Sequence, residues 1–256
     1  MDILIVGLHI GVFAAALLQA ATGIGFGIIA GPILLIVMGS TSAVHVSILL
    51  SLFISALIVP TLRHNIDRVL LVRLVIGSLV GLPLGIYLFL HIELEMLKFL
   101  AAIVVAYMAA VVWRAGTAGR RVSARPERHG WMRDFATGLL SGVMTTSLAM
   151  PGPPVASRLM VLARTRDVVR ATTLALFVIS YTAAILVQAA WATVSEDTLI
   201  FAAWLIPSAT LGLLVGGALA GKFSEAAFRI LISAILALTA CALLANSSGV
   251  VVDLWT

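Results

Sequence analysis

Two segments rich in glycine and proline interrupt long apolar stretches of the chain. They are residues 22–27 (Thr-Gly-Ile-Gly-Phe-Gly) and residues 150–154 (Met-Pro-Gly-Pro-Pro). Glycine lets a backbone turn and approach a ligand closely, and proline suits the first turn of a helix. A helix that begins after such a break presents free N–H groups and the positive end of its dipole. We therefore expect the two breaks to face each other and to bind an anion, although packing glycines and kink prolines are the alternative.

Few polar side chains accompany these breaks, and those few are candidates for contact with a bound anion. Ser47, Ser51 and Ser55 recur every four residues, so they share one helix face. Hydroxyls on membrane helices also bond to their own backbone or to a neighbouring helix, which is the alternative role here. We predict no catalytic residue, metal site or cofactor. The predicted substrate-binding residues are Gln19, Thr22, Gly23, Gly25, Gly27, Ser51, Thr146, Pro151, Gly152, Pro153 and Arg158.

Arg158 has two interpretations. It lies six residues after Gly152, about 9 Å along the half-helix by rise. In the first interpretation its side chain snorkels to the cytoplasmic surface. In the second it is a cation at an inner gate that contacts a sulfonate or carboxylate. We expect no Asp or Glu in the middle of a span, so any coupled protons would travel with the anion rather than along a carboxylate relay.

Long apolar segments must position these residues. Six are near the roughly 20 residues that a helix needs to cross a bilayer: 42–60, 68–90, 96–113, 168–190, 198–220 and 226–246. Residues 28–38 and 155–163, which follow the breaks, reach only about half of that thickness. We predict an all-α polytopic membrane protein with eight hydrophobic segments. About six are full transmembrane helices, and two are broken or re-entrant hairpins over residues 3–38 and 134–163. Two full spans in place of each hairpin would give the same sidedness.

Composition and charge support a membrane protein. The chain is 62% hydrophobic with a mean hydropathy of +1.17, whereas about half of a soluble domain is apolar. Most Lys and Arg residues fall in four clusters, which the positive-inside rule assigns to the cytoplasm: 63–73, 114–133, 158–170 and 222–229. Both termini are then extracytoplasmic. The excess of positive charge anchors helices and contacts membrane lipid, so we expect no nucleic-acid partner.

An internal repeat relates the two halves of the chain. Gly11 and Gly138 are 127 positions apart, and so are Gly25 and Gly152. The small-residue pairs Gly81/Gly85 and Gly212/Gly216, which we assign to close helix packing, also correspond. We predict a first repeat over 1–113, a basic cytoplasmic linker over 114–132 and an inverted second repeat over 133–256. Broken helices in corresponding positions of inverted repeats are typical of secondary transporters.

At these residues the chain resembles the sulfite exporter TauE/SafE family of membrane transporters over essentially its whole length. The resemblance rests on Gly23-x-Gly25-x-Gly27, Pro32, Ala43, Gly81-x-Pro83-x-Gly85, Gly152-Pro153-Pro154-Val155 and Arg170-Ala171-Thr172. The chain departs from many members at 148–151, where they are richer in glycine, and at Arg158, where they have Tyr. The resemblance implies proton-coupled export of small anions, namely sulfite, organic sulfonates or related carboxylates.

The leading hypothesis is a secondary anion transporter of the bacterial cytoplasmic membrane that works by alternating access. Its expected partners are a small anion, protons and lipid. An anion channel of the same architecture and a non-transporting membrane subunit are the alternatives. An enzyme is not expected, because the sequence has no HExxH, no GxSxG and no intramembrane pair of aspartates.

Overall fold

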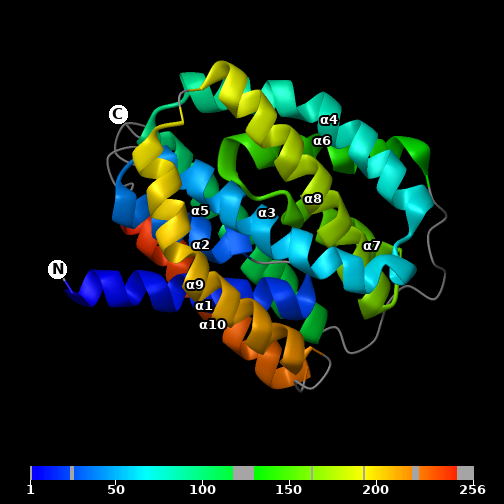
Figure 1. The fold of residues 1–256 in the computed structure, drawn as a ribbon. Coiled ribbons are helices and arrows are strands. Elements are labelled where there is room, and N and C mark those ends of the chain that lie inside the picture. The colour runs from blue at the N-terminus through cyan, green and yellow to red at the C-terminus, as the bar shows by residue number, and fades with distance from the viewer. Residues whose placement is uncertain are drawn as a thin grey trace, which may run out of the picture.

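A computed structural model describes residues 2–23, 26–117, 130–162, 164–192, 194–220 and 225–246. Every regular element in these ranges is a helix, and the helices pack into one bundle (Figure 1). Gly25, most of the predicted 114–132 linker and Lys222 lie outside the described residues. The elements are α1 (Asp2–Thr22), α2 (Phe26–Met38), α3 (Ser42–Leu62), η1 (Arg63–Asn65), α4 (Arg68–His91), α5 (Leu94–Thr117), α6 (Trp131–Leu148), α7 (Gly152–Val161), α8 (Arg166–Trp191), α9 (Glu196–Leu219) and α10 (Glu225–Asn246).

Six stretches of the described chain are long and apolar enough to cross a membrane, which confirms a polytopic membrane protein. They are Ile5–Thr22, Ser42–Asn65, Arg68–His91, Leu94–Trp113, Arg166–Trp191 and Glu196–Leu219. This set differs from the predicted one at both ends of the chain. The 21-residue helix α1 is long enough to span by itself, so the first break lies beyond a full-length helix. In α10 the apolar stretch found among the described residues is the shorter Ser233–Ala245.

The chain reverses direction at both breaks. Helix α2 runs back along α1, and this brings Ile33 of α2 against Gly11 of α1. A methyl group added at Gly11 would lie 2.9 Å from the Cδ1 atom of Ile33. Helix α7 runs back along α6, where the Ser141 hydroxyl donates to the carbonyl oxygen of Pro151 (2.9 Å). With 13 and 10 residues, α2 and α7 are each about half as long as a full span. A short helix therefore follows each break, as predicted, but the first of them follows a helix of full length.

The sequence explains the reversal after α6. Ala149 takes the left-handed conformation (φ 57°). The N–H groups of Ala149 and Met150 donate to the carbonyls of Thr145 and Met144, both at 3.0 Å. The bond from Ala149 is that of an αL-type helix end, and both bonds satisfy carbonyls in the last turns of the helix. Pro151 follows and cannot continue the helix, and α7 then begins at Gly152. The first break begins similarly, since Gly23 has φ +80° and its N–H donates to Gln19 O (2.8 Å).

Glycines hold two pairs of helices at close range. Methyl groups added at Gly77, Gly81 and Gly85 of α4 would overlap the backbone of α6, and those added at Gly212 and Gly216 of α9 would overlap the backbone of α1. This confirms the packing role predicted for Gly81, Gly85, Gly212 and Gly216. Gly217 differs, with nothing within 4 Å. In the first half the fourth helix, α4, packs on α6, and in the second half the fourth helix, α9, packs on α1. Such an exchange is expected of an inverted repeat. The inverted repeat itself stays a prediction.

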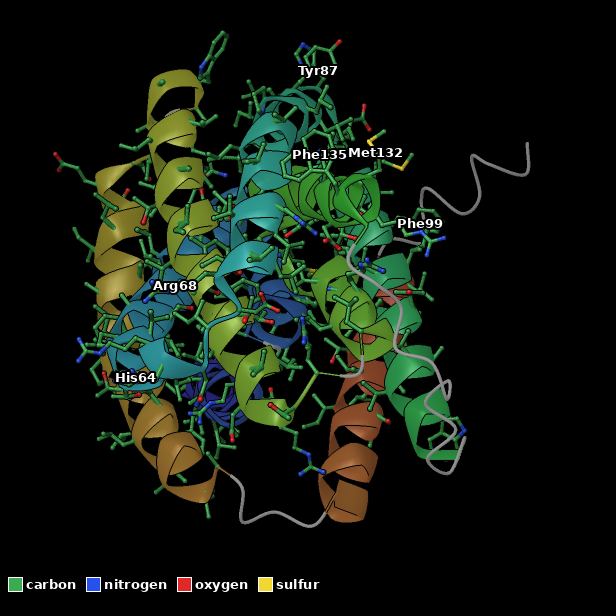
Figure 2. The ribbon with its side chains drawn as sticks, turned by 90° about the vertical axis from the view of Figure 1, so that its right-hand side faces the viewer. His64, Arg68, Tyr87, Phe99, Met132 and Phe135 are labelled. Carbon is green, nitrogen blue, oxygen red and sulfur yellow. The ribbon has the colours of Figure 1, made fainter. Side chains whose placement is uncertain are left out.

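Residues of three basic clusters lie at one end of the bundle. Helix α4 extends away from Arg68 toward Tyr87 in Figure 2. Residues 77, 81 and 85 of α4 face 135, 139 and 143 of α6, so α6 runs parallel to α4 and both helices begin at the same end. The start of α8 joins them, because Asp67 N–H donates to the Thr172 hydroxyl (3.0 Å). The clusters in 63–73 and 158–170 therefore share one end with Arg133, the last residue of the 114–133 cluster, in agreement with the predicted sidedness.

Candidate functional site

The two helix breaks lie against each other inside the bundle. A methyl group added at Gly27, in the first turn of α2, would overlap the carbonyl oxygen of Ala149 in the second break. One added at Gly31 would lie 3.2 Å from the Met150 methyl carbon. Gly27 is therefore a position where only a bare backbone fits. Phe26 and Ala149 are fully buried and Met150 is 1% exposed, so the crossing of the two hairpins is closed off by protein on all sides.

Side chains from neighbouring helices satisfy the carbonyls around the second break. The Tyr181 hydroxyl of α8 donates to Ala149 O (3.0 Å), and Gln188 Nε2 donates to Thr146 O (3.2 Å). Together with the bond from Ser141 to Pro151 O, these contacts remove the cost of leaving backbone oxygens unpaired in an apolar interior. Three carbonyls at this break thus have side-chain donors from within the protein.

A second polar cluster joins α1 and α3 beside the crossing. Gln19 Nε2 donates to Ser51 O (3.1 Å) and to the Ser55 hydroxyl (2.8 Å), which orients the amide. Ser47, Ser51 and Ser55 are all fully buried, in agreement with their predicted common face. Three polar atoms of this cluster, namely Gln19 Oε1, Ser47 Oγ and Ser51 Oγ, have no hydrogen-bond partner in the described chain.

The two predicted threonines use their hydroxyls within the protein. Thr22 Oγ1 donates to Leu18 O (2.7 Å) in its own helix. Thr146 Oγ1 donates to Leu82 O of α4 (3.0 Å), where it packs against Gly85. Both contacts are the backbone-bonding alternative for these residues, so the structure places Thr22 and Thr146 at the breaks but gives their hydroxyls structural partners.

The N-termini of α2 and α7 differ in their capacity to bind an anion. Each helix has four N–H groups in its first turn without an intrahelical acceptor. In α7, Pro153 and Pro154 supply no N–H, so this end is poor in donors. Helix α2 begins with Phe26, Gly27, Ile28 and Ile29, which all carry one. The sequence analysis treated the two ends as equivalent, but they differ in the number of N–H donors that their first turns contain.

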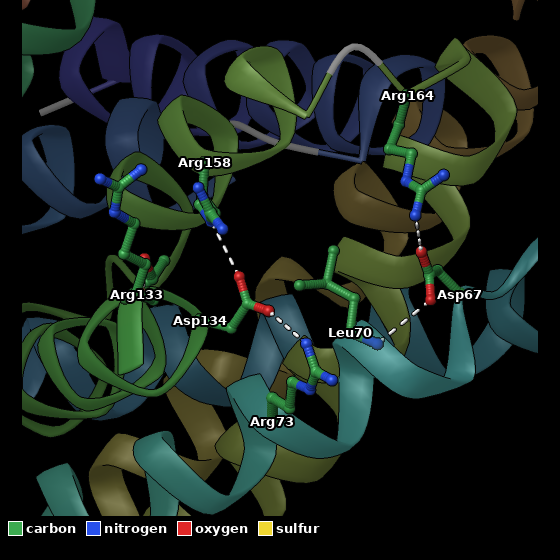
Figure 3. A network of polar contacts seen from close by, with 8 residues as sticks. Asp67, Leu70, Arg73, Arg133, Asp134, Arg158 and Arg164 are labelled. Atoms are coloured by element: carbon green, nitrogen blue, oxygen red, sulfur yellow. Dashed lines mark hydrogen bonds and ion pairs between the residues drawn. The ribbon is translucent and has the colours of Figure 1, made fainter. Parts of the chain in front are cut away.

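Arg158 forms a buried ion pair. Its Nε donates to Asp134 Oδ1 (2.8 Å), and Asp134 Oδ2 accepts from Arg73 NH1 (3.1 Å; Figure 3). Asp134 is fully buried, and Arg158 is 7% exposed. The snorkelling interpretation is therefore wrong, because the guanidinium turns toward a buried carboxylate instead of the surface. Asp134 lies in the first turn of α6, so it does not contradict the expectation that no Asp or Glu stands in the middle of a span. The sequence analysis did not select Asp134 as a partner for Arg158.

Arg170 belongs to the Arg170-Ala171-Thr172 motif on which the family resemblance rests, but it was not among the predicted substrate-binding residues. It lies in the second turn of α8 and borders the first break, since a methyl group added at Gly23 would lie 2.8 Å from its Cα and 3.2 Å from its Cγ. Its Nε is buried and has no hydrogen-bond partner in the described part of the chain. In the sequence Arg170 looked like one more member of a topology-setting basic cluster. Arg170 is the last charged residue before a long apolar segment, and this position was the sequence signal that could have identified it as a candidate site residue.

Comparison with known proteins gives one match. No curated protein and no solved structure matches the chain. A family model described as Sulfite exporter TauE/SafE matches residues 8–243, which include both breaks and all the residues of the crossing.

Proposed function

The chain belongs to the sulfite exporter TauE/SafE family, and from this membership we propose that it exports small anions across the bacterial cytoplasmic membrane. The substrates are sulfite, organic sulfonates or related carboxylates, and export is coupled to protons. The observation that carries the proposal is the meeting of the two broken hairpins at Gly27 and Ala149, inside the protein. Discontinuous helices that meet within the bundle are where secondary transporters bind their substrates.

The chemistry of the crossing supports a small protonated oxyanion. The first turn of α2 supplies N–H donors beside the break, and the Ser47 hydroxyl is a further donor without a partner in the described chain. Gln19 Oε1 is an acceptor, held in place by the two bonds of its own amide nitrogen. A protonated oxyanion satisfies both kinds of group, because it offers oxygen acceptors and one O–H donor. A proton can then cross together with the anion, without a carboxylate relay.

Burial of the crossing supports a carrier over a channel. The residues at the contact are 0–1% exposed, so an anion bound there is shut off from both ends of the bundle. Release then requires the two hairpins to move relative to each other, which is the basis of alternating access. An open channel would instead need a continuous polar path through the bundle without any movement of the hairpins.

Flux measurements on purified protein in proteoliposomes test this proposal. We expect saturable transport of radiolabelled sulfite and methanesulfonate that a proton gradient drives uphill. Gly27→Ala is expected to abolish it, because the added methyl group overlaps Ala149, whereas Gly217→Ala, the matched control, has open space and keeps wild-type flux. Non-saturating flux that only runs downhill would identify a channel. A folded wild-type protein without flux or thermal stabilisation by any of these anions would refute the proposal.

A further inference from the structure

One arginine of the bundle lacks the partners that its neighbours have. Asp134 pairs with Arg73 and Arg158, and Asp67 pairs with Arg164 (2.8 Å; Figure 3). The exposed carboxylate of Asp167, three residues earlier on α8, acts on Arg170 through space, but the buried Nε of Arg170 has no hydrogen-bond acceptor in the described chain. A guanidinium nitrogen removed from water without an acceptor is unfavourable. The arrangement therefore leaves a donor at this position that an acceptor from outside the protein can satisfy.

The position of Arg170 links this donor to the hairpin crossing. The aliphatic part of its side chain runs past Gly23, in the break between α1 and α2. Its helix reaches the second break eleven residues later, where Tyr181 bonds to Ala149 O. By helix rise the two contacts are roughly 16 Å apart, so one face of α8 leads from the charged end of the bundle to the crossing.

Thr173 is the next polar group along that face. It follows Arg170 by three residues, and Phe177 and Tyr181 continue the same face at intervals of four. Thr173 is fully buried, and its Oγ1 has no hydrogen-bond partner among the residues that the structure describes. Thr172 beside it is already engaged with the Asp67 N–H. Thr173 and Arg170 are thus two consecutive donors on one helix face whose acceptors are missing.

We propose that Arg170 and Thr173 form the entry subsite where the transported oxyanion is captured from the cytoplasmic side, an inference that rests on the proposed function. The edge of a guanidinium presents two parallel N–H donors that fit two oxygens of a sulfonate, sulfite or carboxylate. The hydroxyl of Thr173 donates to the same anion one turn deeper. The subsite selects oxyanions over halides, because a halide cannot accept from both N–H groups at the spacing of two oxygens.

Transport by sided membrane vesicles that contain the full chain tests this subsite. Inverted vesicles expose the cytoplasmic face and right-side-out vesicles the opposite face, and the probes are radiolabelled sulfite and methanesulfonate. The variants are Arg170→Gln, Arg170→Lys and Thr173→Val, with Arg166→Gln as the matched control because Arg166 is exposed one turn earlier on the same helix. Thermal unfolding of each purified variant verifies that it is folded.

We expect Arg170→Gln to raise the half-saturation concentration at the cytoplasmic face by about tenfold or more, with a much smaller change from the opposite face. Arg170→Lys keeps the charge but loses the paired donors, so it falls between wild type and Arg170→Gln. Thr173→Val gives an increase of a few fold, and Arg166→Gln gives none. A purely structural role would affect both faces equally.

The outcomes separate this inference from the proposed function. Wild-type flux with unchanged half-saturation in Arg170→Gln and Thr173→Val overturns the entry subsite and leaves the transporter proposal standing. Absence of flux in the wild type overturns the transporter proposal itself. If Arg170→Gln does not fold, Arg170→Lys and Thr173→Val decide, and wild-type half-saturation in both overturns the subsite.

Discussion

Replacing Asp134 by Asn is expected to destabilise the protein more than any other change of a single charge in the described bundle. Asp134 is fully buried and accepts from Arg158 of α7 and Arg73 of α4, so it ties three helices together. Asn keeps the shape and one acceptor oxygen but removes the negative charge. What remains is the guanidinium of Arg158, only 7% exposed, without a countercharge.

The magnitude follows from the unequal burial of the two arginines. Removing one partner from a buried ion pair costs about 3–5 kcal/mol, because the other charge stays buried. Arg73 is 23% exposed in its side chain and lies 5.9 Å over the Trp131 ring, so solvent and the ring accommodate its charge. Most of the loss therefore comes from Arg158, and we expect Asp134→Asn to lower the free energy of unfolding by about 3 kcal/mol. Arg73→Gln should cost about 1 kcal/mol.

A double-mutant cycle measures the pair itself. Replacing both partners, as in Asp134→Leu with Arg158→Met, removes the uncompensated charge and is expected to return within about 1 kcal/mol of wild type. Reversible unfolding in mixed SDS and non-ionic micelles gives the four free energies. The reasoning is refuted if Asp134→Asn loses less than about 1 kcal/mol, or if the double variant is as unstable as the sum of its two single variants.

Two further predictions concern the backbone at the crossing and the packing of α4. Gly85→Ala should lower the free energy of unfolding by about 2 kcal/mol or more, because the methyl group overlaps Val143 O and Thr146 Oγ1, while Gly217→Ala stays within about 0.5 kcal/mol of wild type. The same micelle titration measures both, and equal effects would contradict the assigned packing. Ala149→Gly should raise the free energy of unfolding by up to about 1 kcal/mol, because glycine adopts the left-handed conformation at φ 57° without strain. The greater conformational entropy of glycine in the unfolded chain offsets part of this gain. A lower midpoint in thermal unfolding would show that the alanine methyl group is needed for packing.

The parts of the fold that depend on local sequence were predictable. Hydropathy located the spans, and Gly and Pro located both breaks, because a membrane helix has a fixed length and those residue types interrupt it. The length of α1 was misjudged, since the first hairpin was considered as a whole rather than as a full helix followed by a short one. The repeat suggested that the breaks meet, and Gly27 does lie against Ala149.

The parts that depend on pairing between distant residues were not predictable. Nothing local distinguishes Arg158, which pairs with a buried carboxylate, from Arg170, whose buried Nε has no hydrogen-bond partner in the described chain. The difference arises because α6 places Asp134 beside α7, whereas the first break places an uncharged glycine beside α8. Similarly, the serines of α3 were correctly placed on one face, but only the structure shows their partners. Gln19 donates to Ser51 O and to the Ser55 hydroxyl, whereas the hydroxyls of Ser47 and Ser51 have no hydrogen-bond partner among the described residues.

These contacts make the two half-helices unequal, although the sequence repeat suggests that they are equivalent. Helix α7 begins with two prolines and carries an arginine that a buried aspartate holds, so it offers few donors and is fixed to α4 and α6. Helix α2 has no charge, keeps every N–H of its first turn, and lies beside Gln19 and the first break that Arg170 borders. An anion at the crossing must therefore draw its donors from the α2 side. This asymmetry explains why the entry subsite at Arg170 and Thr173 belongs to the first break, and why weakening the Asp134 pair and removing Arg170 should give different defects, one in stability and the other in the affinity of one membrane face.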